Sequence, residues 1–182
     1  MSKRLACVAL VAVAALLAAG CGGSSDSAGS DTSPTAAWAG GLCSAINTWT
    51  TSISSIGETI TGGDLSKNSL TSAVDDAKSA TETFTSDLEG LGKPDTEAGQ
   101  KAKDSVDQLS TDLNAGVATI QDALDGASGI AGLVTAAPVI VTTLGTMGSQ
   151  VTTTISSLQS LDAKGELEDA FKQSSSCDKL AG

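Results

Sequence analysis

Four long stretches of this chain place an apolar side chain at every third or fourth position, and this spacing restricts the fold more than any other feature. The first stretch carries Trp38, Leu42, Ile46, Trp49, Ile53, Ile56 and Ile60. A helix with 3.6 residues per turn brings such positions onto one face, whereas a strand would alternate its side chains. We therefore predict a helix with one buried face.

Three further long stretches repeat the pattern, and glycine or proline separates them. The second has Leu70, Val74, Ala77, Thr81, Phe84, Leu88 and Leu91. The third has Ala102, Val106, Leu109, Leu113, Val117, Ile120 and Leu124. The fourth has Leu133, Ala137, Ile140, Leu144, Met147, Val151, Ile155 and Leu158. A short acidic helix is expected over residues 166–179, with Leu167, Ala170, Phe171 and Cys177 as its apolar positions.

These helices predict an all-α fold, an antiparallel up-down-up-down four-helix bundle with a short fifth C-terminal helix. The sustained spacing favours left-handed packing of the coiled-coil type. Ser33 and Pro34 are suited to the cap and first position of the first helix, although Gly40 and Gly41 weaken its first turns. We therefore expect the ordered helix to begin nearer Leu42.

Two other helix starts are less sharply defined by the sequence. Either Asp64 or Ser66 can cap the second helix, and either Asp95 or Thr96 can open the third. Acidic side chains early in the third helix would interact favourably with its dipole. The predicted helical domain covers residues 35–182.

The N-terminus has the layout of a secretory signal peptide. Lys3 and Arg4 precede an uncharged run of Leu, Val and Ala, which ends in small residues directly before Cys21. This ending, Leu17-Ala18-Ala19-Gly20-Cys21, resembles the lipobox of bacterial lipoproteins. The resemblance implies that residues 1–20 are cleaved as a signal and that a lipid is attached to Cys21. It also implies a location on the extracytoplasmic face of the bacterial cell membrane.

Residues 21–34 are rich in Gly, Ser and Asp and predict a flexible tether with an end-to-end distance on the order of 20 Å. Removal of Lys3 and Arg4 with the signal leaves eight basic and 21 acidic residues, a net charge of −13. This charge disfavours nucleic acid and anionic lipid as partners. The lipid on Cys21 must therefore hold the domain at the membrane.

Cysteine usage agrees with export. Cys7 leaves with the signal and Cys21 is the expected lipid site, so Cys43 and Cys177 remain. The two can form one intramolecular disulfide, and such a bond persists in the oxidising environment that an exported protein meets. Two free thiols or an intermolecular bridge are the alternatives. The long loop between them would contribute about 5 kcal/mol in the chain-entropy model.

The fourth helix carries no charge between Asp125 and Asp162, and residues 129–147 are apolar enough to be considered as a membrane segment. A fixed span would place Cys177 in the reducing cytoplasm, away from Cys43. Several threonines, glycines and Pro138 also oppose a span. We favour a helix surrounded by partners in the bundle, with conditional insertion of residues 129–147 as the alternative.

The residue types favour binding over catalysis. The chain has no His, which removes the usual catalytic triads and most transition-metal sites. Asp104 and Asp107 share one helical face and could bind a hard cation with help, but a solvated face explains them more simply. We expect no enzymatic activity, cofactor or metal. The predicted function is a binding or structural module of the cell envelope, with an envelope protein or a small apolar ligand as partner.

Overall fold

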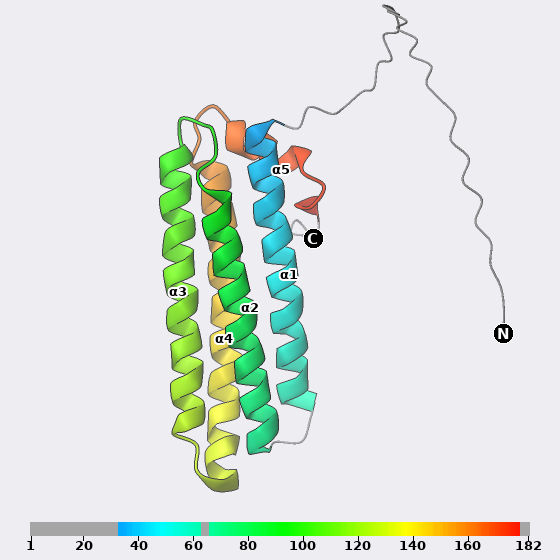
Figure 1. The fold of residues 1–182 in the computed structure, drawn as a ribbon, viewed down its shortest axis with the longest axis vertical. Coiled ribbons are helices and arrows are strands. Elements are labelled where there is room, and N and C mark those ends of the chain that lie inside the picture. Colours follow the sequence, from blue (N-terminus) through cyan, green and yellow to red (C-terminus); the bar gives the residue numbers. More distant parts are fainter. Residues whose placement is uncertain (1–32, 63–65, 179–182) are drawn as a thin grey trace, which may run out of the picture. The chain divides into compact units, whose positions relative to one another are not determined.

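The computed structural model describes residues 33–62 and 66–178, and this part of the chain is helical. The helices are α1 (Pro34–Gly62), α2 (Lys67–Leu91), α3 (Gly99–Asp125), α4 (Gly129–Ser160) and α5 (Glu166–Gln173) (Figure 1). The predicted all-α class is confirmed, and the described helices form a bundle. The predictions for the signal, Cys21 and most of the tether lie outside the described residues.

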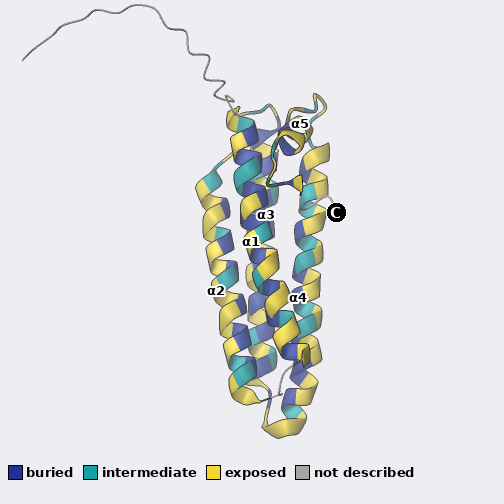
Figure 2. Cartoon of the chain, turned by 90° about the vertical axis from the view of Figure 1, so that its right-hand side faces the viewer, coloured by how far each residue is buried: buried dark blue, intermediate teal, exposed yellow. Residues whose placement is uncertain are grey.

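The predicted apolar stripes are the buried faces of the helices (Figure 2). Every predicted stripe position of α1 and α3 is buried. Leu91 of α2 and Ile155 of α4 are the exceptions, because both are only partly buried. Helical spacing alone therefore identified the large apolar side chains of the core, and the buried hydrophobic residues that it missed are alanines and Cys43.

The long helices pack against their neighbours in the chain, and α1 also contacts α4. The connections are short, residues 92–98 between α2 and α3, 126–128 between α3 and α4, and 161–165 before α5. The short helix α5 packs against both α1 and α4 and lies across their ends in Figure 2. Its Leu167, Ala170 and Phe171 are buried there, so α5 belongs to the core.

The prediction that ordered helix begins near Leu42 is wrong, because α1 runs unbroken from Pro34 through Gly40 and Gly41. The Ser33 hydroxyl accepts a hydrogen bond from the Ala36 amide at 3.1 Å. Ser33 therefore caps the N-terminus of α1, as predicted. The two glycines are sites of close approach instead. A Cβ at Gly41 would lie 2.5 Å from Leu91, and one at Gly40 would lie 2.9 Å from Ser174.

The third helix begins at Gly99, later than the predicted start at Asp95 or Thr96. Residues 94–99 form a turn first, in which the Thr96 amide donates to the Pro94 carbonyl at 3.0 Å. The Gly99 amide then donates to the Thr96 carbonyl at 3.0 Å. A Cβ at Gly99 would overlap the Pro94 carbonyl oxygen, so this tight turn requires glycine.

The second helix has Ser66 as its cap, which was one of the two predicted candidates. Ser66 and Ser69 form a reciprocal capping box. The fifth helix is shorter than predicted, because it ends at Gln173 and the chain turns. The Ser174 carbonyl accepts from the Cys177 amide at 2.9 Å in that turn. The turn brings Cys177 back toward α1.

Candidate functional site

Cys43 and Cys177 form the disulfide that the cysteine arithmetic predicted. Their Cα atoms are 5.1 Å apart, which lies in the usual range for a disulfide, and the bond joins positions 134 residues apart in the sequence. Asn47 of α1 donates to the Ser176 carbonyl at 2.7 Å beside it. The C-terminal turn is thus attached to α1 by a covalent bond and by a hydrogen bond.

Aromatic packing closes the same end of the bundle. Phe171 of α5 meets Trp38 of α1 edge to face, with ring centroids 6.4 Å apart. The Trp38 indole donates to the Gly92 carbonyl at 3.2 Å, which connects α1 to the turn after α2. The disulfide, α5 and the Gly92 turn therefore interlock at the start of α1.

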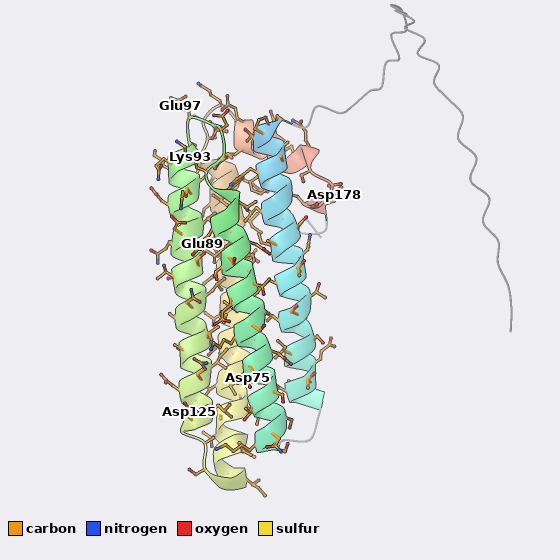
Figure 3. All side chains as sticks on the ribbon, in the orientation of Figure 1. Asp75, Glu89, Lys93, Glu97, Asp125 and Asp178 are labelled. Atoms are coloured by element: carbon orange, nitrogen blue, oxygen red, sulfur yellow. A yellow bond between two sulfur atoms is a disulfide. The ribbon has the colours of Figure 1, made fainter. Side chains whose placement is uncertain are left out.

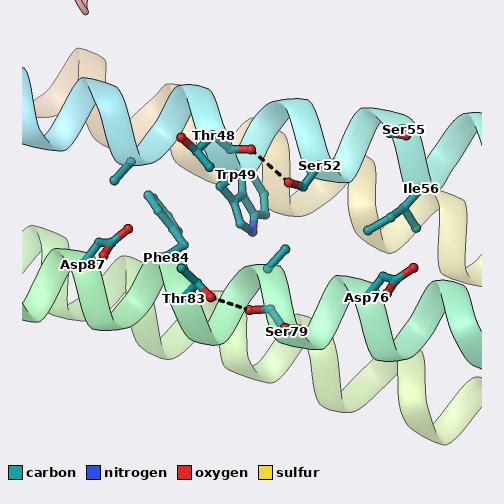
Figure 4. Close-up of a pocket in the computed structure, with 12 residues that line it drawn as sticks. Thr48, Trp49, Ser52, Ser55, Ile56, Asp76, Ser79, Thr83, Phe84 and Asp87 are labelled. Atoms are coloured by element: carbon teal, nitrogen blue, oxygen red, sulfur yellow. Dashed lines mark hydrogen bonds between the residues drawn. The ribbon is translucent and has the colours of Figure 1, made fainter. Parts of the chain in front are cut away.

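A groove of about 440 Å³ lies between α1 and α2 (Figure 4). Trp49 and Phe84 stack on its floor, with ring centroids 5.5 Å apart, and Asp76 and Asp87 lie at its two ends. The buried Trp49 indole donates to the Thr81 hydroxyl at 3.2 Å. The floor is thus part of the core, and its indole donor already has a partner. This groove offers no unsatisfied group on its floor for a ligand.

A second groove, of about 340 Å³, lies between α1 and α4 beside the disulfide. Ile46 of α1, Val151 of α4 and Phe171 of α5 are among its lining residues, and none of the residues that line it is charged. Both cysteines also line it. An uncharged, largely apolar groove suits an apolar ligand. Neither groove could be predicted from the spacing of residues within one helix.

Large apolar side chains are exposed at the start of α4. Among the described residues these are Ile130, Val134 and Val139, at 78%, 55% and 42% exposure. Figure 1 places the first turn of α4 beyond the adjoining ends of α1 and α2. Within residues 33–62 and 66–178, α4 is also the one helix that is long and apolar enough to cross a membrane. Of the 18-residue stretch of α4 that meets this criterion, 33% is buried. That criterion considers length and composition alone.

Charged side chains lie on the outside of the bundle, as Asp75, Glu89 and Asp125 illustrate (Figure 3). Of the two candidate cation ligands, Asp107 pairs with Lys103 and Asp104 accepts a hydrogen bond from Gln100 at 2.8 Å. Across the described part of the chain, no three residues of the His, Cys, Asp and Glu types are grouped to hold a metal ion. These aspartates thus contact neighbours on their own helix.

Among the residues that the structure describes, Lys172 has a clearly shifted pKa. The hydrogen bond and the charge of Glu168 raise the pKa of Lys172 above its ordinary value. Both residues lie on α5, four positions apart, and their side chains are exposed. Such a pair is typical of a helix surface and contributes little to stability. The pair lies near the end of the groove between α1 and α4, and its two charges largely cancel.

No protein-family model matches the chain, and neither a curated protein nor a solved structure is significantly similar to it. The function is therefore argued from the residues and the geometry of the described bundle. Cys21, the predicted lipidation site, lies outside the described residues.

Proposed function

We propose that this chain is a lipid-anchored lipoprotein on the extracytoplasmic face of the bacterial cell membrane, where its helical domain acts as a binding or structural module. The Cys43–Cys177 disulfide is the observation that supports export, because disulfides persist in oxidising compartments. The lipobox-like sequence before Cys21 supports the anchor. An envelope protein or a small apolar ligand is the proposed partner, and no catalytic role is proposed.

We also propose the up-down-up-down topology for the four long helices. The short connections at residues 92–98 and 126–128 support it, because short links favour antiparallel neighbours. Contacts between α1 and α4 support it further, since they close the ring of four helices. In this topology the Cys43–Cys177 disulfide lies near the start of α1, which follows the tether. We therefore propose that the disulfide-bonded end of the bundle faces the membrane.

Replacement of Cys21 by serine tests the anchor. We expect wild-type protein to incorporate labelled palmitate and to enter the detergent phase on Triton X-114 partition, because two or more acyl chains bind a membrane durably. Cys21→Ser should lose the label and enter the aqueous phase. The matched control, Cys43→Ala with Cys177→Ala, removes two other cysteines and should keep the label. Retention of label by Cys21→Ser would contradict the proposal.

A second function, conditional insertion of residues 129–147 into a membrane, is favoured by the exposure of Ile130, Val134 and Val139. The chain carrying Cys21→Ser in place of its anchor should then release dye from liposomes. Ile130→Asp with Val134→Asp should abolish the release, because a charge in the bilayer is costly. Thr153→Asp, at an exposed position of the same helix outside residues 129–147, is the matched control. Absence of leakage at every pH between 4 and 8 would exclude insertion.

A further inference from the structure

The groove between α1 and α4 is built from three helices and the disulfide. Ile46 and Thr50 form its α1 wall, and Val151 and Ile155 are on its α4 wall. Phe171 and the Cys43–Cys177 bond also line it. Ile46, Val151 and Phe171 belong to the buried core, so the groove reaches the interior of the bundle.

Small side chains on α4 leave the space that forms the groove. Small residues recur on it at Gly148, Thr152 and Ser156, which lie on one helical face four residues apart. A Cβ built at Gly148 would meet nothing within 4 Å. The space beside this glycine is therefore open, and a larger side chain there would enter the groove.

The groove is uncharged, but the hollow that adjoins it has charged residues. None of the residues along its length is charged, although the whole chain has a net charge of −11. An adjoining hollow of about 290 Å³ shares Gln159, Phe171 and Cys177 with it. Glu168, Lys172 and Asp178 line that hollow. An apolar groove thus continues into a polar end, an arrangement that complements an amphiphile.

The dimensions select a narrow ligand. The α4 wall extends from Gly148 to Gln159, which is about 16 Å at 1.5 Å per residue. A helix with its side chains is about 10–12 Å wide and would need a far larger volume than 340 Å³ over this length. The groove is therefore too small to enclose a partner helix, whereas an extended hydrocarbon chain fits its form.

We propose that the α1–α4 groove binds the hydrocarbon chain of a single-chain lipid whose polar head carries no net charge, with the head in the hollow lined by Glu168, Lys172 and Asp178. The inference rests on the proposed function and names the class of its apolar ligand. A fatty-acid anion should bind more weakly, because two carboxylates and only one lysine line the hollow and the chain is acidic overall.

Fluorescence quenching by a brominated monoacylglycerol tests the proposal. The protein is the mature chain with Cys21→Ser, and the lipid is kept below its micelle concentration. Trp38 contacts Phe171, so bromine in the groove should quench its emission. Gly148→Leu should fill the groove, whereas Gly145→Leu is the matched control, because it also has open space but does not line the groove. Both changes replace a helical glycine by a better helix former.

Saturable quenching is expected, with an apparent Kd about tenfold higher for Gly148→Leu and unchanged for Gly145→Leu. Thermal melting of both variants should match or exceed that of the parent, which shows that the fold is intact. Equal quenching in all three proteins would overturn the proposed site. Tighter binding of the brominated fatty-acid anion would overturn the proposed neutral head group. Absence of saturable quenching would overturn the lipid class. None of these results affects palmitate labelling at Cys21. The labelling experiment therefore tests the lipid anchor independently of the quenching experiment, which tests the groove.

Discussion

Replacing both Cys43 and Cys177 by alanine is expected to lower the free energy of unfolding by about 5 kcal/mol, the chain-entropy value for a closed loop of this size. The bond joins residues 134 positions apart, so it removes many conformations from the unfolded chain. Small domains have a free energy of unfolding of about 5–15 kcal/mol, so the loss is a large share of the total. Alanine is preferred to serine because Cys43 is fully buried, and alanine adds no polar group to the core.

Urea denaturation of the mature chain with Cys21→Ser, followed by circular dichroism, measures this loss. The double alanine variant should unfold at a much lower urea concentration, while its helical content in water stays close to that of the parent. The buried Leu167 and Phe171 still hold α5 against the bundle. Added reductant should shift the parent to the same midpoint and leave the variant unchanged. A midpoint that responds to neither treatment would show that the bond does not stabilise the fold.

Phe84→Ala is expected to lower the free energy of unfolding by about 3–5 kcal/mol, the range for truncation of a buried aromatic residue. Phe84 is 2% exposed and stacks on Trp49 at 5.5 Å between ring centroids. Its removal takes away that contact and leaves a cavity on the floor of the α1–α2 groove. Water can then approach Trp49, so its fluorescence should move to longer wavelength.

Val139→Ala on α4 is the control for Phe84→Ala. Its side chain is 42% exposed, and its truncation should change the free energy of unfolding by no more than about 0.5 kcal/mol. The same urea titrations measure both variants, and tryptophan emission reports on Trp49. If Phe84→Ala and Val139→Ala cost the same, Phe84 is not part of a packed core.

Helical spacing predicted the fold class and the core well, because each long helix has one face that must be buried. Trp49 and Leu113 could be assigned to the interior from their spacing alone, and both are buried. Spacing was less informative about helix ends. Gly40 and Gly41 have low helix propensity, yet α1 continues through them because Ser174 and Leu91 pack closely there. Tertiary packing outweighed local preference at this point.

The candidate site was predicted only in part. With Cys7 assigned to the predicted signal and Cys21 to the predicted lipid site, Cys43 and Cys177 were left as the candidate pair, and the structure contains their disulfide. The α1–α4 groove beside it could not be predicted, because it depends on which helix faces lie opposite one another. Gly148, Thr152 and Ser156 form a recurring set of small residues in the sequence. That set marks a groove only once α1 is known to lie against α4.

The sequence by itself determined the all-α class, the buried face of each long helix and the pair of cysteines available for a disulfide. Those properties follow from side-chain periodicity and from elimination, which need no knowledge of neighbours. The tertiary structure decided that Gly41 lies within the α1 helix, that Ile130 is exposed, and that an uncharged groove lies beside the disulfide. Each of these depends on contacts or gaps between helices distant in sequence, and local spacing carries no information about them.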